Sequence, residues 1–321
     1  MELAGLLNYA VFSITLAGIY AVTALGLNMQ WGFTGMLNIG VAAFYSVGAY
    51  ATAIVTGPEG AYLGGFGLPF PVGLAVAMAA SGVIAFLIGL ITVNLRTDYL
   101  AIASIGIAEI IRLIFTNEEW LTGGVRGIAG IPKPLGGLIP GGDQALYMIL
   151  VLVLLVAVYL AFERAYNSPW GRVLRAIRED EPATEAAGKS VLRFRLQAFV
   201  IGAMAMGLAG ALYAHFVSFI SPEAFRPDLA TFLIWVMLIA GGSGNNRGAI
   251  LGAFVIWAVW SGTEFLTGFL PSGMVTQAGA FRVLLIGILL QVILIARPQG
   301  LLPERPPRSP VESRREGRRR M

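Results

Sequence analysis

The sequence of 321 residues contains no cysteine, one histidine and few charged residues. Without cysteine there can be no disulfide, no thiolate metal site and no cysteine nucleophile. Because His215 is the one histidine, a multi-histidine metal site is excluded as well, and we expect neither a metal nor another cofactor in this chain. Charged residues make up 12% of the sequence, against about 25% in soluble proteins, and 57% of the residues are hydrophobic. This composition argues against a soluble enzyme and excludes a disordered chain.

The hydrophobic residues form long apolar stretches. A helix needs about 20 mostly apolar residues to cross roughly 30 Å of hydrocarbon. The stretches that reach or approach this length are about 6–29, 34–56, 71–93, 99–115, 145–162, 196–217, 229–243, 249–268 and 281–297. We therefore predict an all-α integral membrane protein, a polytopic helix bundle of about nine (eight to ten) transmembrane helices over residues 1–302.

Two regions within these stretches are rich in glycine. Gly32–Ala53 has glycine at positions 32, 35, 40 and 48, and Leu238–Gly252 reads LIAGGSGNNRGAILG, which we do not expect to cross as one helix. Small residues let helices approach closely, and a broken helix is tolerated where protein or a water-filled cavity covers its backbone. Close packing and lining of a pathway both remain open for these glycines.

The basic residues orient the chain, because Lys and Arg concentrate in the cytoplasmic loops of membrane proteins. The loop 163–195 holds seven of them, and we place it in the cytoplasm. Counting spans outward from this loop adds to the same side Arg96, Arg247, Arg297 and the seven arginines of the tail. The other side receives Arg126, Lys133 and Arg226. This asymmetry predicts nine crossings, with the N-terminus outside and the C-terminus cytoplasmic.

The net charge of +4 comes entirely from the last residues, 303–321, which hold seven arginines and three glutamates. The excess therefore describes a tail and not a basic face for nucleic acid. With four prolines as well, this segment is predicted to be a disordered cytoplasmic tail. Its arginines can approach anionic membrane lipid, but a solvated tail that helps to fix the topology is the simpler interpretation.

The cytoplasmic loop 163–195 is predicted to be folded. Pro169 suits the first turn of a helix, and Val173, Leu174 and Ile177 follow at helical spacing. The charged residues beside them are Arg172, Arg175, Arg178, Glu179, Asp180 and Glu181. After an interruption at Pro182, a second short helix over Ala183–Ala187 is expected to end at Gly188. A charged element of this length indicates a docking surface; an interfacial helix without a partner is the alternative.

Within this loop, residues 183–190 (ATEAAGKS) fit a loose phosphate-loop pattern. A phosphate loop follows a buried strand and opens a helix. Here the preceding residues are REDEP, which are charged and unlike a strand, and the first position lacks glycine. We therefore reject nucleotide binding by this chain.

Polar residues inside the predicted spans are few. Glu109 and Arg112 lie one helical turn apart, so an ion pair is the main interpretation and a pathway role the alternative. His215, near the outer end of a span, is assigned to packing in preference to a proton relay. The amides of Asn28, Gln30 and Asn38 can form hydrogen bonds between helices, and Asn28 and Asn38 are candidates for the pathway. The spans contain no series of carboxylates, which argues against an ion-coupled carrier.

Seven segments in order resemble the LivM-type permease subunits of branched-chain amino acid ABC transporters. They are LNMQWGFTGMLNIGVAAFYSVGAY (27–50), RTDYLAIASIGIAEIIRL (96–113), LTGGVRGIAGIP (121–132), GRVLRAIREDEPATEAAG (171–188), AGALYAHFVSFISPEAF (209–225), GGSGNNRGAILGA (241–253) and RPQGLL (297–302). Together they span nearly the whole chain.

The resemblance implies the permease fold of ABC importers and a set of partners. A second, homologous permease completes the pathway, two cytoplasmic ATPase subunits bind the ATP, and an extracytoplasmic solute-binding protein delivers leucine, isoleucine or valine. The chain itself is then not an enzyme. By resemblance, Gly171–Gly188 is the segment that couples to an ATPase, and Glu185-Ala186-Ala187 is similar to the EAA element of ABC permeases. The Ile-x-Leu-Pro part of that element is absent here.

The sequence departs from the family pattern at Arg126, where a small or polar residue is expected, and at Asn245-Asn246-Arg247, where apolar or small residues are expected. Permeases for urea and short amides are similar to this family, so the class of transporter is better defined than the solute. A stand-alone secondary transporter or a purely structural membrane subunit are the other classes. The first lacks candidate ion ligands, and the second does not need the amphipathic loop.

Overall fold

The computed structural model describes residues 2–58, 65–134, 143–267 and 278–304. Among these residues the long helices are α1 (Glu2–Thr34), α2 (Val41–Thr56), α3 (Phe70–Thr92), α4 (Thr97–Asn117), α6 (Asp143–Asn167), α9 (Val191–Val217), α10 (Pro227–Gly241), α11 (Asn246–Thr267) and α12 (Ala278–Ala296). The shorter elements are α5 (Glu119–Thr122), η1 (Gly124–Arg126), α7 (Pro169–Glu179), α8 (Glu181–Ala186), η2 (Pro222–Phe225) and the strands β1 (Ile128–Ala129) and β2 (Phe219–Ile220).

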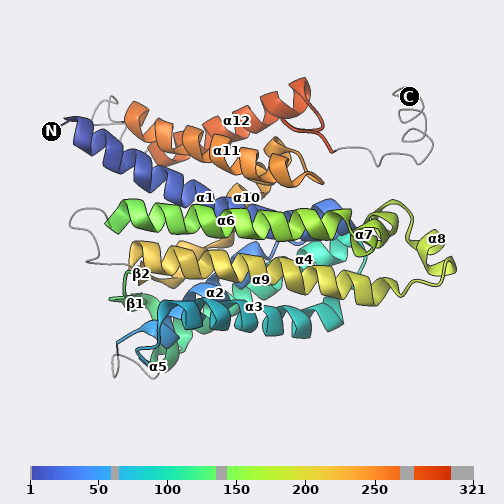
Figure 1. The fold of residues 1–321 in the computed structure, drawn as a ribbon, viewed down its shortest axis with the longest axis horizontal. Coiled ribbons are helices and arrows are strands. Elements are labelled where there is room, and N and C mark those ends of the chain that lie inside the picture. The colour runs from blue at the N-terminus through green and yellow to red at the C-terminus, as the bar shows by residue number, and fades with distance from the viewer. Residues whose placement is uncertain (1, 59–64, 135–142, 268–277, 305–321) are drawn as a thin grey trace, which may run out of the picture.

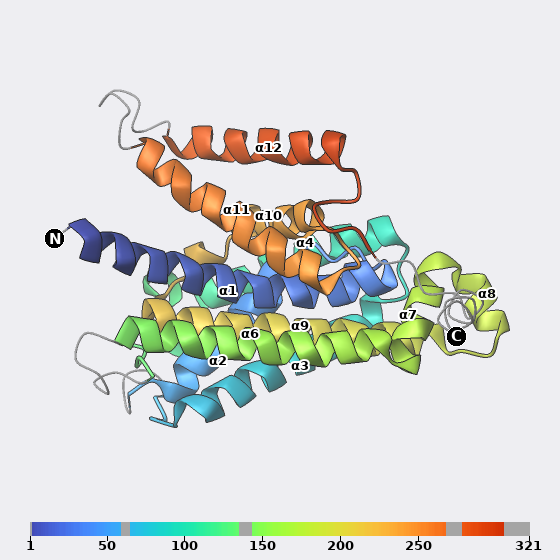
Figure 2. The same cartoon turned by 45° about the horizontal axis from the view of Figure 1, so that its top comes forward.

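The long helices lie side by side and alternate in direction, so the bundle has two ends (Figure 1). The N-terminus lies at one end, where β1 pairs antiparallel with β2. The opposite end carries α7 and α8, which project beyond the long helices (Figure 2). Seven of the described helices are long and apolar enough to cross a membrane, and α2 is a shorter apolar helix. Each predicted stretch contains one long helix, although the stretch 34–56 is helical only from Val41 onward, and this confirms the polytopic all-helical class.

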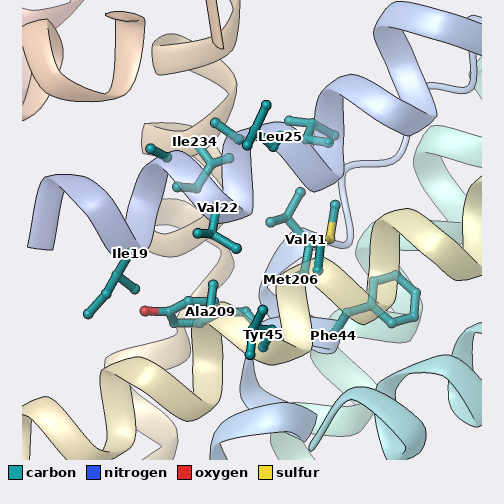
Figure 3. Close-up of a cluster of buried hydrophobic side chains, with 14 of the residues drawn as sticks. Ile19, Val22, Leu25, Val41, Phe44, Tyr45, Met206, Ala209 and Ile234 are labelled. Carbon is teal, nitrogen blue, oxygen red and sulfur yellow. The ribbon is translucent and has the colours of Figure 1, made fainter. Parts of the chain in front are cut away.

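The centre of the bundle consists of α1, α2 and α9. Figure 3 shows side chains from these helices and from α10 meeting in one apolar cluster, with Val22, Phe44 and Met206 among them. Glycine brings α2 and α9 into backbone contact, since a Cβ at Gly48 would lie 2.1 Å from the Gly207 carbonyl oxygen. Such an approach is possible because small residues leave room between helix backbones.

A break in the chain separates α1 from α2. At about 1.5 Å per residue the 16 residues of α2 reach roughly 24 Å, less than the hydrocarbon thickness of about 30 Å. The predicted span 34–56 is therefore corrected: residues 35–40 are non-helical and α2 begins inside the bundle. Side-chain oxygens accept from backbone amides that have no helical partner here. Ile39 N donates to Ser104 Oγ (2.9 Å), Gly40 N to Asn38 Oδ1 (2.8 Å) and Ala42 N to Thr231 Oγ1 (3.1 Å). These bonds satisfy amides for which lipid offers no acceptor.

A second break lies between α10 and α11, within the segment that we did not expect to cross as one helix. Gly242 and Gly244 adopt positive φ angles of 114° and 82°, which glycine accepts without strain. The chain after α12 returns to this turn, where the amides of Leu301 and Leu302 donate to the carbonyls of Ala240 and Gly241, each at 2.9 Å. The predicted tail 303–321 lies outside the described residues except for its first two positions.

Candidate functional site

The helix pair α7–α8 forms from strong local signals. The Ser168 hydroxyl caps α7 by accepting from the amide of Gly171 (3.3 Å), and Pro169 occupies the first turn. The Asp180 carboxylate caps α8 in the same way, accepting from the amide of Ala183 (3.0 Å). The second helix begins earlier than predicted, because Pro182 lies in its first turn and does not interrupt it. Gly188 ends it with φ = 76°, as expected.

The apolar side of α7 packs against the bundle. Leu174 and Ile177 are buried, with 0% and 2% of their surface exposed, whereas Val173 is half-buried. A Cβ at Gly171 would lie 2.4 Å from the carbonyl oxygens of Ala165 and Tyr166, so α7 lies directly against the end of α6. This packing fixes α7 relative to the long helices.

Arg178 joins three parts of the chain. Its guanidinium donates to the carbonyl of Gly32 at the end of α1 and to the carboxylate of Glu304 (2.8 Å). The Tyr166 hydroxyl of α6 donates to the other oxygen of Glu304 (3.3 Å). We call this set of contacts the arginine hub. Glu304 was not singled out from the sequence, because nothing local in the tail marks it as the partner of a residue 126 positions away.

Further contacts fix the helix pair to α6 and α9. The Arg175 guanidinium lies over the Tyr166 ring, 4.0 Å from its centroid, and donates to the Tyr166 carbonyl (3.2 Å). The Glu181 carboxylate pairs with Arg195 of α9 (2.8 Å). The Trp170 indole donates to Gln197 (2.8 Å) on the same helix. Three long helices, α1, α6 and α9, are therefore tied to this pair.

The predicted coupling residues fall into two groups. Arg175, Arg178 and Glu181 are half-buried and bonded within the chain, and Arg178 also pairs with the exposed Glu179 (3.0 Å). The residues whose side chains or backbone are exposed are Arg172, Glu179, Asp180, Glu185 and Gly188. We call these five residues the exposed coupling face. They offer both signs of charge at the end of the molecule where α8 projects (Figure 2).

The phosphate-loop-like segment 183–190 has none of the required context. It follows the end of α7 and lies partly in α8, so a helix stands where a phosphate loop needs a strand. Lys189 is exposed between α8 and α9. Among the described residues no group of acidic residues and histidine is arranged to hold a metal.

Amide side chains connect the central helices. Asn28 donates to Asn246 Oδ1 (3.0 Å), and the amide of Gly244 donates to Asn28 Oδ1 (2.8 Å). Asn246 in turn donates to the Glu163 carboxylate (3.0 Å), which links α1, α11 and α6. The predicted hydrogen bonding between helices is confirmed for Asn28. The contribution of Asn246, noticed in the sequence only as a departure from the family pattern, is to complete this link.

Asn38 has a corresponding role near the break before α2. It donates to Gln30 Oε1 (2.7 Å), and Gln30 donates to the carbonyl of Phe199 in α9 (2.8 Å). The Trp235 indole of α10 donates to the Asn38 carbonyl (3.0 Å). Asn38 and Gln30 thus fix the irregular backbone in place, and both are fully buried.

Glu109 and Arg112 form the predicted ion pair, with an N–O distance of 2.5 Å. The environment differs from the one expected for mid-membrane charges: the two side chains are 41% and 20% exposed, and Arg112 also approaches Glu223 of η2 (3.4 Å). The pair lies at the bundle end opposite α7.

Both ring nitrogens of His215 are hydrogen-bonded. Nδ1 lies 2.7 Å from the Pro132 carbonyl oxygen, which can only accept, so Nδ1 carries the proton. Nε2 of a neutral ring then accepts from the Thr52 hydroxyl at 2.9 Å. With its ring edge-on to Phe70 and 1% exposed, the side chain has the environment of a packing histidine.

These features define a multi-pass helical membrane protein. Non-helical breaks separate α1 from α2 and α10 from α11, and an anchored, charged helix pair lies at one end. The family model described as branched-chain amino acid transport system / permease component matches residues 9–294. The chain belongs to this family. The resemblance to the permeases of branched-chain amino acid ABC importers is thereby confirmed, and the chain is a transport protein and not itself an enzyme.

Named relatives support this assignment. The chain is 34% identical to the high-affinity branched-chain amino acid transport system permease protein LivM of Salmonella typhimurium, over 93% of this chain and 71% of the relative. It is 31% identical to the probable LivM permease of Methanocaldococcus jannaschii, over 90% and 92%. A more distant relative is the LivH permease of Escherichia coli, 26% identical over 90% and 92%. No solved structure matches the chain.

Proposed function

We propose that this chain is one of two permease subunits in an ATP-driven importer of leucine, isoleucine and valine. The second subunit is a homologous permease, two cytoplasmic ATPase subunits bind and hydrolyse the ATP, and an extracytoplasmic solute-binding protein delivers the solute. Both LivM-named and LivH-named permeases are similar to this chain, which fits a pair of related subunits. No metal or cofactor of its own is required.

The observation that carries the proposal is the anchored helix pair α7–α8. Its buried side is tied to α1, α6 and α9, its coupling face is exposed, and α8 projects beyond the long helices (Figure 2). A docked ATPase that moves α8 would therefore pull on three long helices at once. A helix that only lay on the membrane surface would not need these bonds.

The orientation follows from the basic residues. In the described part of the chain, the α7 end carries Arg96, Arg164, Arg172, Arg175, Arg178, Lys189, Arg193, Arg195, Arg247 and Arg297. The opposite end carries Arg112, Arg126, Lys133, Arg226 and, early in α12, Arg282. We place the α7 end in the cytoplasm of a prokaryotic cell and the N-terminus outside its inner membrane, in accord with the positive-inside rule.

The test is uptake into proteoliposomes that contain this chain, its homologous permease and the two ATPases, with ATP enclosed on the α7 side. Radiolabelled leucine should accumulate when the solute-binding protein and ATP are both present. Accumulation without ATPases or ATP would indicate a secondary transporter and refute the proposal. Uptake of urea or acetamide in place of leucine would retain the class and refute the solute.

A further inference from the structure

A cavity of about 170 Å³ lies inside the bundle, between α1, α2, α9, α10 and α11. Its walls include the rings of Tyr20, Tyr45, Tyr213, Trp257 and Trp260, and no charged residue of the described chain lines it. The centroids of Tyr20 and Trp257 are 5.0 Å apart, and those of Tyr45 and Tyr213 are 5.8 Å apart. We call this cavity the aromatic pocket.

Two polar groups of the aromatic pocket lack partners. The Tyr45 hydroxyl and the Trp257 indole nitrogen are buried without a hydrogen bond to any described residue, and Tyr45 is 5% exposed overall. A buried polar group left unpaired costs about 1–3 kcal/mol, and native proteins pair the great majority of them. The indole N–H can only donate. Neither atom has accessible surface, so a small rotation of each side chain is needed to bring its donor to the acceptor atom of a bound molecule.

The aromatic pocket adjoins a larger cavity of about 780 Å³. Tyr20, Tyr213 and Trp257 line both, and the larger cavity extends to Lys133 and Gln144 at the bundle end opposite α7. In the proposed orientation this is the end at which the solute arrives. A polar molecule that enters the larger cavity from this end would be separated from the aromatic pocket only by the side chains that line both.

We propose that the aromatic pocket is a transient binding site for the zwitterion of an apolar L-amino acid. After these rotations, the Trp257 N–H and the Tyr45 O–H would donate to its carboxylate. Its ammonium would lie against the aromatic faces, which attract cations. Its side chain would pack on the apolar wall formed by Leu233 and Ile234. This inference rests on the proposed function, since it takes the solute from there.

Other guests fit less of the pocket. A hydrocarbon chain would leave both donors unpaired, and a free anion would find no compensating charge. Ordered water would satisfy the donors but would make no use of the aromatic faces. Water as the sole occupant is therefore the outcome that opposes the proposal.

The test is saturation-transfer NMR on the complete transporter in nanodiscs, without ATP or the solute-binding protein. The probes are L-leucine, isopentylamine, which lacks the carboxylate, and 4-methylpentanoate, which lacks the ammonium. Leucine should bind, and both analogues should bind more weakly. Tyr45→Phe removes one hydroxyl and should weaken leucine binding about 2- to 10-fold, as expected for one lost hydrogen bond; Trp257→Phe should act likewise.

The chain offers a matched control in Tyr50→Phe. The Tyr50 hydroxyl of α2 is also buried without a hydrogen bond to a described residue, but Tyr50 lines neither the aromatic pocket nor the larger cavity beside it. This variant should bind leucine normally. Equal binding by wild type and Tyr45→Phe, or no leucine signal at all, would overturn the inference. If ATP-driven uptake persists in that case, only the pocket assignment fails; loss of uptake in the wild-type complex would instead refute the proposed function.

Discussion

The central helix α9 and the outer helix α12 are both apolar, yet they are built for different neighbours. In α9, 67% of the most hydropathic stretch is buried within the chain, against 6% in α12. A Cβ added at Gly210 of α9 would lie 1.9 Å from the Tyr45 carbonyl oxygen, whereas one added at Gly287 of α12 would meet nothing within 4 Å. The same residue type is thus a packing requirement at the centre and incidental at the edge. Substitutions at buried central positions should therefore cost more stability than matched substitutions at exposed outer positions.

The largest effect is expected from Gly48→Ala. The new Cβ would lie 2.1 Å from the Gly207 carbonyl oxygen, so α2 and α9 would have to separate. Overpacking of this kind costs about 1–3 kcal/mol or more. The matched change Gly106→Ala, in the outer helix α4, meets nothing within 4 Å and should be neutral. Thermal unfolding in detergent would measure both; equal melting temperatures would show that the close approach is not structural.

The next largest effect is expected at the arginine hub. Arg178→Gln leaves the Glu304 carboxylate without its ion pair and should destabilise the chain by about 1.5–3 kcal/mol, the usual value for a hydrogen bond to a charged group. Arg172 lies on the same helix, but its side chain is exposed. Arg172→Gln should therefore leave the stability unchanged. Limited proteolysis of α7–α8 would report the loosening. If both variants are cleaved at the same rate, the hub does not hold the pair.

Helical spacing could not have separated these two arginines. The sequence placed Arg172, Arg175 and Arg178 together, since residues three apart share one side of a helix. What distinguishes them is the position of Gly32 and Glu304, which come from the far ends of the chain. The nine apolar stretches were predictable because hydropathy is local. The break at residues 35–40 was not, because its acceptors, Ser104 and Thr231, lie on other helices.

A smaller effect is expected at the buried amide link. Asn246→Asp would face the Glu163 carboxylate with a second one and should destabilise the bundle by about 1–3 kcal/mol. Adding Glu163→Gln supplies a donor again and should restore most of the loss. The double-mutant cycle of unfolding free energies measures this coupling. Additive losses in the double variant would indicate that the two side chains do not interact.

The smallest effect is expected from the Glu109–Arg112 pair. The Glu109 carboxylate is 41% exposed within the chain; we expect water to reach it, and Glu109→Gln should then cost at most about 1 kcal/mol. Membrane abundance and melting temperature should stay close to those of the wild type. A loss as large as that of Arg178→Gln would mean that the pair lies in a dry environment after all.

The most direct test of the central claim, that α7–α8 couples this permease to an ATPase, is co-purification of the ATPase with a variant of the exposed coupling face. Arg172→Glu combined with Glu185→Lys reverses two exposed charges that have no described partner within the chain. Arg126→Glu, an exposed reversal at the opposite end, is the control. We predict that the double variant inserts at normal abundance but loses the ATPase, while the control retains it. Normal ATPase recovery and normal leucine uptake by the double variant would contradict the account.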